Sequence, residues 1–273
     1  MTSERSDLVL IDKPRPHTTV ITMNRPERMN SMAFSLMVPL HEAFEAVAAD
    51  NDTTCVILTG TGRGFCSGAD TSGDGGPPPN IAGMTLTRIA TKAMTVLADL
   101  VPAMQRMPQP VICAVNGAAI GGGMCLTLGA DIRLAGESAY FRAAGSNNGL
   151  TATELGLSFL LPRAIGSSRA FEIMLSGRDV SAQEAAAMGL VSRVVPDDEL
   201  LNEALDLADQ INGWSTQGTA LTKRTMWAGL EIGSLRAAIE MESHTQLYVR
   251  MTTKNFEEAV RARKEGRPAE FKD

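Results

Sequence analysis

Over the first half of the chain, apolar residues recur in some segments at every second position, as in strands, and in others at helical spacing. Residues 19–23 alternate apolar and polar side chains, which is typical of a half-buried strand. Residues 31–49 carry apolar side chains at helical spacing, whereas residues 55–58 and 111–115 are short apolar runs that predict buried strands. Because strand–helix–strand order favours parallel sheets, this pattern predicts an α/β fold.

The pattern changes near residue 181, beyond which helical spacing dominates. Ser181-x-x-Glu184 predicts a capped helix start and Gly189 its end. We therefore expect residues 1–195 to form an α/β core and residues 196–273 a helical region. Other expected elements are helices at about 85–107, 124–129, 198–211, 235–249 and 255–264, and a strand at 132–135.

Composition excludes several classes of function. The 273 residues are 44% hydrophobic and 21% charged, as in globular proteins, and the net charge of −6 argues against nucleic-acid binding. Four cysteines without a CxxC pair and three histidines predict no metal site. Residues 110–130 lack charge, but the glycines at 121–123 favour a strand–turn–helix over a membrane span. We expect a cytoplasmic protein without membrane contact.

Two glycine-rich turns are the candidate site. Residues 64–70 and residues 116–123 each follow a predicted strand, so both should lie where α/β folds bind ligands. Backbone N–H groups from two such turns can converge on one oxygen and stabilise a developing oxyanion by several kcal/mol. The alternative is that these glycines serve only tight turns and packing. A dinucleotide site fits poorly, because the second turn lacks the G-x-G-x-x-G spacing.

The two turns, Phe-Cys-Ser-Gly-Ala-Asp at 65–70 and Ala-Val-Asn-Gly-Ala-Ala-Ile-Gly-Gly-Gly at 114–123, resemble those of the crotonase (enoyl-CoA hydratase/isomerase) superfamily. Segments 24–30, 130–133 and 188–191 fit the same family in order. The resemblance implies a spiral of ββα units and a helical C-terminal region that assembles a homotrimer or a dimer of trimers. It also implies an acyl-CoA thioester substrate, as in fatty acid β-oxidation, with coenzyme A entering as part of the substrate and no separate cofactor.

Carried over to this sequence, the resemblance makes the backbone N–H groups of Ala69 and Gly122 the donors to the thioester oxygen. Other substrate-binding positions follow from the same motifs, and they are Arg28, Ser67, Gly68, Asp70, Thr71 and Gly121, together with Ala69 and Gly122 themselves. Asp70 is also expected to hold the first turn through side-chain-to-backbone hydrogen bonds.

The catalytic acids of the family's hydratases are missing from their usual positions. Cys125 and Gly145 stand where those enzymes carry two glutamates. Glu154 is a candidate replacement, because dienoyl-CoA isomerases of the superfamily carry an acidic residue near this position. A single carboxylate favours a double-bond shift over hydration. The alternative is that Glu154 and Thr151 form a capping box at a helix start.

Two other functions stay open at this point. The chain could be an acyl-CoA binder that has lost catalysis. It could also be a cysteine-dependent thioester hydrolase, because residues 64–68 fit G-x-C-x-G around Cys66 and His244 follows downstream. The hydrolase requires Cys66 on a strained turn from a strand into a helix.

Overall fold

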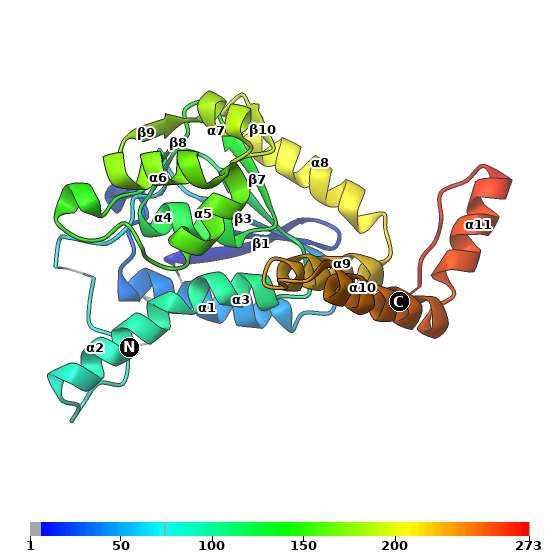
Figure 1. Cartoon of the computed structure of the whole chain (residues 1–273), viewed down its shortest axis with the longest axis horizontal. Coiled ribbons are helices and arrows are strands. Elements are labelled where there is room, and N and C mark those ends of the chain that lie inside the picture. The colour runs from blue at the N-terminus through cyan, green and yellow to red at the C-terminus, as the bar shows by residue number, and fades with distance from the viewer. Residues whose placement is uncertain (1–6, 74, 273) are drawn as a thin grey trace.

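A six-stranded, mostly parallel sheet forms the centre of the computed structural model, which describes residues 7–73 and 75–272 (Figure 1). The strands lie in the order β1-β2-β3-β5-β7-β10, and only β1 and β2 pair antiparallel. Their bounds are β1 Val9–Arg15, β2 Thr18–Met23, β3 Cys55–Gly60, β5 Val111–Val115, β7 Ile132–Gly136 and β10 Arg193–Val195.

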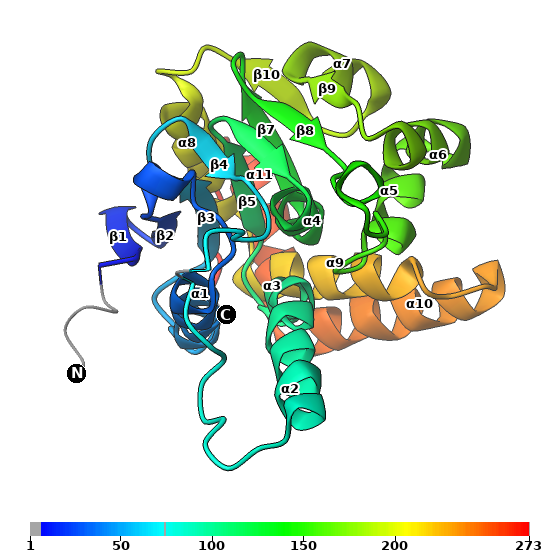
Figure 2. The same cartoon turned by 90° about the vertical axis from the view of Figure 1, so that its left-hand side faces the viewer.

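A second, four-stranded sheet has the order β4-β6-β8-β9 and lies in front of the first in Figure 2. Its strands are short, and their bounds are β4 Gly64–Cys66, β6 Ala118–Ile120, β8 Tyr140–Arg142 and β9 Asp179–Ser181. Along the chain, the pairs β3–β4, β5–β6 and β7–β8 place one strand in each sheet, and helices follow each pair. This repetition is the expected spiral of ββα units.

The helices close the spiral and extend it at the C-terminal end. Their bounds are α1 Phe34–Ala48, α2 Leu86–Ala98, α3 Leu100–Arg106, α4 Gly122–Gly129, α5 Leu157–Ile165, α6 Ser167–Ser176, α7 Ala182–Met188, α8 Leu200–Asn212, α9 Thr216–Gly229, α10 Leu235–Thr252 and α11 Asn255–Glu265, with short 3-10 turns at Pro26–Arg28 and Ser146–Asn148. Helices α10 and α11 project beyond the sheets (Figure 1).

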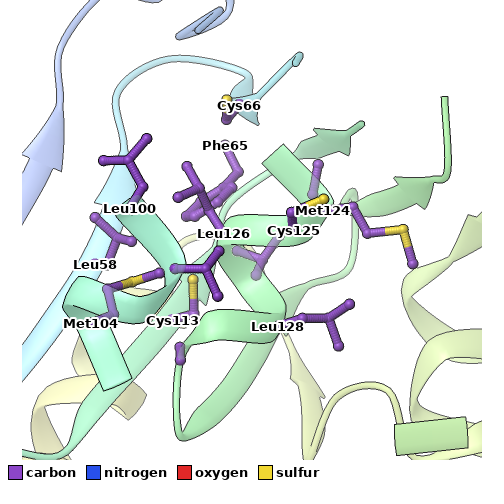
Figure 3. Packing of buried hydrophobic residues seen from close by; sticks show 14 of the residues in the cluster. Leu58, Phe65, Cys66, Leu100, Met104, Cys113, Met124, Cys125, Leu126 and Leu128 are labelled. Atoms are coloured by element: carbon purple, nitrogen blue, oxygen red, sulfur yellow. The ribbon is translucent and has the colours of Figure 1, made fainter. Parts of the chain in front are cut away.

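Two apolar clusters occupy the two faces of the larger sheet. The main cluster packs α1, α3 and α4 against the sheet, and Figure 3 shows Leu58, Met104 and Leu126 within it. The smaller cluster lies under α8, with Ile57 and Ala204 among its members. Methionine and cysteine side chains contribute to the interior, and all four cysteines are buried and free.

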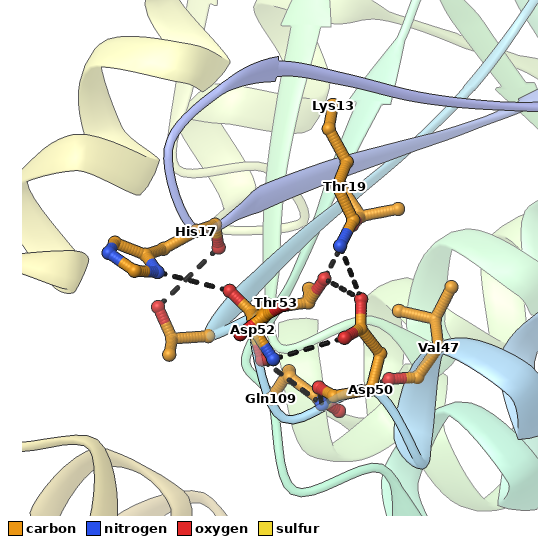
Figure 4. Close-up of polar contacts among 9 residues, drawn as sticks. Lys13, His17, Thr19, Val47, Asp50, Asp52, Thr53 and Gln109 are labelled. Carbon is orange, nitrogen blue, oxygen red and sulfur yellow. Dashed lines mark hydrogen bonds and ion pairs between the residues drawn. The ribbon is translucent and has the colours of Figure 1, made fainter.

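A buried amide ties the end of α1 to the strand that follows α3 (Figure 4). Gln109 Nε2 donates to the carbonyl oxygens of Val47 and Thr53 at 3.0 and 3.2 Å. Nearby, the Asp50 carboxylate accepts from Lys13 at 2.6 Å and from the Thr53 hydroxyl at 2.7 Å. These bonds fix the connection between α1 and β3.

Most of the predicted elements are confirmed. The strands expected at 19–23, 55–58, 111–115 and 132–135 are β2, β3, β5 and β7. The Ser181 hydroxyl accepts from the Glu184 N–H at 3.2 Å, and Gly189 ends α7 in the left-handed conformation with φ +84°.

Three predictions about elements are wrong in detail. The helix expected at 85–107 is two helices, because the chain turns at Asp99 between α2 and α3. The short strands β4 and β6 lie inside segments read as glycine turns, since pairing with distant strands, rather than local pattern, creates them. Helix α9 lacks a clean apolar period and was not expected.

Helix α9 is anchored to the core by a buried ion pair. Lys223 Nζ lies 3.0 Å from the Asp131 carboxylate and donates to the Met104 and Gln109 carbonyl oxygens at 2.8 and 2.9 Å. Asp131 also accepts from the Trp227 indole N–H at 2.6 Å. Through α9, the helical region after residue 196 is therefore anchored to the spiral. Its expected role in oligomerisation stays a prediction.

Within residues 7–73 and 75–272, the structure contains no helix with the length and apolar character needed to cross a bilayer.

Candidate active site

A pocket of about 690 Å³ lies where the two glycine turns meet. Most of the expected site residues line it, whereas Gly122 is buried and is not among the lining residues. The lining residues are Arg28, Ser31, Ser67, Gly68, Ala69, Asp70, Thr71, Ser72, Ile120, Gly121, Ala144, Gly145, Asn148, Leu150, Thr151 and Glu154. The pocket thus brings together residues that are more than 120 positions apart in the sequence.

The first turn follows β4 and is held by several backbone hydrogen bonds to the segment before α1, one of them from the Ser67 N–H to the Met29 carbonyl oxygen at 3.0 Å. Met32 N–H donates to the Gly68 carbonyl oxygen at 2.7 Å, and Asp70 N–H donates to the Met32 carbonyl oxygen at 3.4 Å. The N–H of Ala69, between these two bonds, has no hydrogen-bond acceptor among the described residues. It is therefore available to a ligand.

The second turn joins β6 to α4. Gly121 occupies the N-cap position with φ +53°, a backbone conformation that side chains other than glycine rarely adopt. Gly122 is the first residue of α4, and its N–H donates to no atom of the described chain. A free N–H at a helix N-terminus attracts negative charge.

The two turns touch, and only glycines permit the contact. A Cβ built on Gly68 would lie 2.7 Å from the Ile120 carbonyl oxygen and 3.6 Å from the Gly122 nitrogen. A Cβ on Gly123 would collide with the Cys66 carbonyl oxygen. The free N–H groups of Ala69 and Gly122 therefore belong to adjoining pieces of backbone.

Asp70 supports the first turn, as expected, but with a charged partner that the sequence did not reveal. Its carboxylate accepts from the Ser72 N–H at 2.9 Å and the Ser72 hydroxyl at 2.6 Å, and it pairs with Arg25 at 2.5 Å. The hydrogen bonds from Ser72 and Arg25 hold the pKa of Asp70 well below its usual range. Asp70 is therefore an ionised structural group.

Glu154 faces the same pocket in a different environment. A Cβ built on Gly121 would lie 3.0 Å from Glu154 Oε1, which places the carboxylate beside the second turn. No hydrogen bond or ion pair reaches this carboxylate from residues 7–73 or 75–272, and burial raises its pKa above the ordinary value of 4.5. A carboxyl group in this state accepts and returns a proton at a higher pH than an exposed glutamate does.

The capping role considered for Glu154 is wrong. No helix begins at Thr151 in the described chain; α5 begins at Leu157, with Gly156 in the N-cap position and no side-chain cap. The reason is that Leu155 and Gly156 both adopt left-handed backbone conformations, with φ +44° and +88°. Their turn separates Glu154 from the helix.

The structure also removes the geometric basis for a hydrolase that uses Cys66. This residue lies in β4 and leads into a loop, not into a helix. It is fully buried, and burial raises the pKa of its thiol to about 12, so a thiolate nucleophile would not form. His244 is exposed on α10.

Some pocket residues were not found from the sequence. Ser31 and Leu150 line the pocket because of how the loops pack. Arg25 is buried beneath it, and its partner Asp70 lies 45 residues further on. The nearest available signal was the 24–30 segment, whose family-like sequence contains Arg25.

Comparison with known proteins agrees with this geometry. The chain is 58% identical over 266 residues to a Mycobacterium tuberculosis protein named probable enoyl-CoA hydratase, covering 97% of this chain and 93% of the relative. It is 37% identical over 230 residues to the 1,2-epoxyphenylacetyl-CoA isomerase of Escherichia coli, covering 83% and 84%.

Solved structures extend the likeness to the fold. A probable enoyl-CoA hydratase/isomerase from Mycobacterium abscessus has a TM-score of 0.93 at 54% identity, covering 97% of this chain and 98% of that one. A monofunctional enoyl-CoA isomerase from M. smegmatis has a TM-score of 0.73 at 52% identity, covering 86% and 99%. Residues 17–273 match the sequence profile described as enoyl-CoA hydratase/isomerase. The chain therefore belongs to the enoyl-CoA hydratase/isomerase family, within the crotonase superfamily, and is an enzyme of that type.

Proposed function

We propose that this enzyme shifts a double bond in an enoyl-CoA thioester, with Glu154 as its single proton-transfer residue. The observation that supports this most directly is the pairing of two unused backbone N–H groups, on Ala69 and Gly122, with one carboxylate that has no charged partner. The second carboxylate of the pocket, Asp70, is occupied by Arg25 and Ser72. Hydration would need a second acid–base group.

In this mechanism, the Glu154 carboxylate removes a proton from the carbon next to the thioester. The C–H electron pair forms a double bond between the α carbon and the thioester carbon, and the carbonyl π pair moves onto the thioester oxygen, where the N–H groups of Ala69 and Gly122 stabilise the negative charge. The existing carbon–carbon double bond becomes conjugated with this enolate, which gives a dienolate. The protonated Glu154 then returns the proton to the carbon at the far end of the dienolate. Atoms and charge balance, and no other reactant is required.

The coenzyme A portion would lie along the first turn. Arg28 and the residues from Ser67 to Thr71 form one side of the pocket, and Gly121 lies opposite. Arginine is suited to bind phosphate groups because it presents several donors in a rigid plane. The substrate itself carries coenzyme A, so no separate cofactor is proposed.

We also propose that the chain works as a homotrimer or as a dimer of trimers. Helix α10 has no buried residue, yet Leu235, Ile239, Leu247, Tyr248 and Met251 on it are exposed large apolar side chains. Several exposed large apolar side chains on one helix are typical of a subunit interface.

Glu154→Gln tests the proposed reaction. The variant keeps the shape of the side chain but cannot accept the proton, so deuterium exchange at the α or γ carbon of an enoyl-CoA should fall by about 10²-fold or more. Binding of the thioester, measured by calorimetry, should be unchanged. Exchange at the wild-type rate would contradict the role of Glu154, and a wild-type protein that binds but turns over no enoyl-, hydroxyacyl- or dienoyl-CoA would be a binder.

A further inference from the structure

We propose that the buried thiol of Cys125 is a positioning residue that holds Glu154 at the proposed reaction site. Cys125 lies one turn into α4, and its Sγ is 3.4 Å from the carbonyl oxygen of Glu154. The inference rests on the proposed function of Glu154 as the proton-transfer group. It assigns a task to a position that, by resemblance, carries a glutamate in the family's hydratases.

The carbonyl oxygen of Glu154 accepts from two directions. Besides the Cys125 thiol, the Leu157 N–H donates to it at 2.8 Å. Cys125 is fully buried, and burial raises the pKa of its thiol well above the ordinary value, so the sulfur keeps its proton and can act as a donor. The backbone at Glu154 is thereby attached to α4 on one side and to α5 on the other.

Leu155, the residue after Glu154, makes a second contact with α4. Leu155 adopts φ +44°, a conformation that is unfavourable for leucine and must be maintained by its surroundings. Its Cδ1 lies 3.3 Å from the position of a Cβ built on Gly122, so the side chain packs on the first residue of α4. Helix α4 therefore contacts the 154–155 segment at Gly122 and again at Cys125.

This arrangement couples the two working parts of the site. The N–H of Gly122 would bind the thioester oxygen, and Glu154 would move the proton. Because both are held by α4, the spacing between donor and carboxylate is set by one short, fully buried helix. Loss of the thiol contact should release Glu154 without disturbing the two N–H groups.

The test compares Cys125→Ala with Cys125→Ser, because serine restores a donor at the same place. Cys113→Ala is the matched control, since Cys113 is an equally buried cysteine of the same apolar cluster in β5 and lies outside the pocket. We expect Cys125→Ala to lower kcat for α-proton exchange about 10-fold with an unchanged KM, because small misplacements of a catalytic group reduce the rate strongly. Its acid limb of kcat/KM should move towards the ordinary pKa of glutamate, because a released carboxylate is better solvated.

Cys125→Ser should recover most of the rate, and Cys113→Ala should keep the wild-type kcat and pH profile. Amide hydrogen exchange of a peptide covering residues 151–157 gives a readout that does not need activity. Exchange should accelerate in Cys125→Ala and not in the other two variants. The proposal is overturned if Cys125→Ala matches the control in this measurement, or if alanine and serine impair the rate equally. If Glu154→Gln keeps full activity, the proposed function fails instead, and the exchange measurement still decides whether Cys125 holds the segment.

Discussion

Two carboxylates line the proposed thioester pocket, and their surroundings give them opposite properties. Arg25 and Ser72 satisfy Asp70 and hold its pKa low, whereas Glu154 has no charged partner in the described chain and burial raises its pKa. Environments that separate two pKa values in this way assign different roles to chemically similar groups. These surroundings favour Glu154 over Asp70 as the group that carries the proposed proton transfer, and they make Asp70 a support of the first turn.

This difference predicts the pH dependence of the reaction. Glu154 must be deprotonated to accept the α proton, so kcat/KM should rise with pH through a pKa above the ordinary glutamate value of 4.5. Steady-state isomerisation of a 3-enoyl-CoA measured from pH 4 upward would show this limb. A profile that is already flat at the ordinary glutamate pKa, or that falls as pH rises there, would contradict the assignment.

The sequence identified Glu154 but not its surroundings. Resemblance pointed to the residue, and the pattern Thr151-x-x-Glu154 pointed equally to a helix cap. The structure decides between them through the left-handed turn at Leu155 and Gly156, which only tertiary packing can maintain. The Arg25–Asp70 pair was likewise hidden, because residues 45 positions apart carry no local signal of their contact.

The two glycine turns act as one element although they come from different units of the spiral. Gly68 lies against the Ile120 carbonyl oxygen, and Gly123 lies against the Cys66 carbonyl oxygen. This contact places the backbone of the first turn directly against the backbone of the second turn. Glycine at these places is therefore required by the close approach of two backbones.

Gly68→Ala should separate the turns. Gly68 has φ +82°, and its added Cβ would press on the Ile120 carbonyl oxygen. Loss of one aligned N–H donor lowers kcat by about 10²–10³-fold in comparable sites. Gly73→Ala is the control, because Gly73 also has φ +82° but a Cβ there would meet nothing within 4 Å.

Both variants carry the same backbone strain, so they should differ in kcat far more than in melting temperature. Equal kcat values for Gly68→Ala and Gly73→Ala would show that the contact between the turns has no catalytic importance. Isomerisation kinetics and thermal unfolding of the two proteins provide the comparison.

At the scale of elements, the sequence predicted those helices and strands whose own residues show a clear hydrophobic period. The apolar strands β3 and β5 and the capped helix α7 were found because their patterns are strong over their own length. The three-residue strands β4 and β6 were missed because they are too short to show a period and exist through pairing with each other. These missed strands precede the two turns of the site, so the site's geometry could be anticipated only through the resemblance.

At the scale of the whole molecule, the C-terminal helices expose several large apolar side chains. Leu235 and Met251 on α10 are 78% and 76% exposed. Helix α9, which precedes the projecting helices α10 and α11, is held to the spiral by the buried Lys223–Asp131 ion pair. An exposed apolar helix next to a helix that is anchored to the core is consistent with the proposed subunit interface, in which other copies of the chain would bury these side chains.

Light scattering coupled to size-exclusion chromatography tests the assembly. The mass should be three or six times the 29.0 kDa of one chain. Met251→Glu combined with Leu247→Glu places two like charges in the proposed interface and should shift the protein towards the monomer, because burying unpaired charges is strongly unfavourable. A wild-type protein that elutes as a monomer at micromolar concentration would contradict the proposed assembly.

The proposed reaction depends on the backbone N–H groups of Ala69 and Gly122, which should hold the thioester oxygen. Isotope-edited infrared spectroscopy of an enoyl-CoA carrying ¹³C at the thioester carbonyl, bound to Glu154→Gln so that it does not react, measures this directly. Two hydrogen bonds in a site shielded from water should polarise the carbonyl and move its band below the position in water. A bound carbonyl that absorbs at or above its frequency in water would contradict the account.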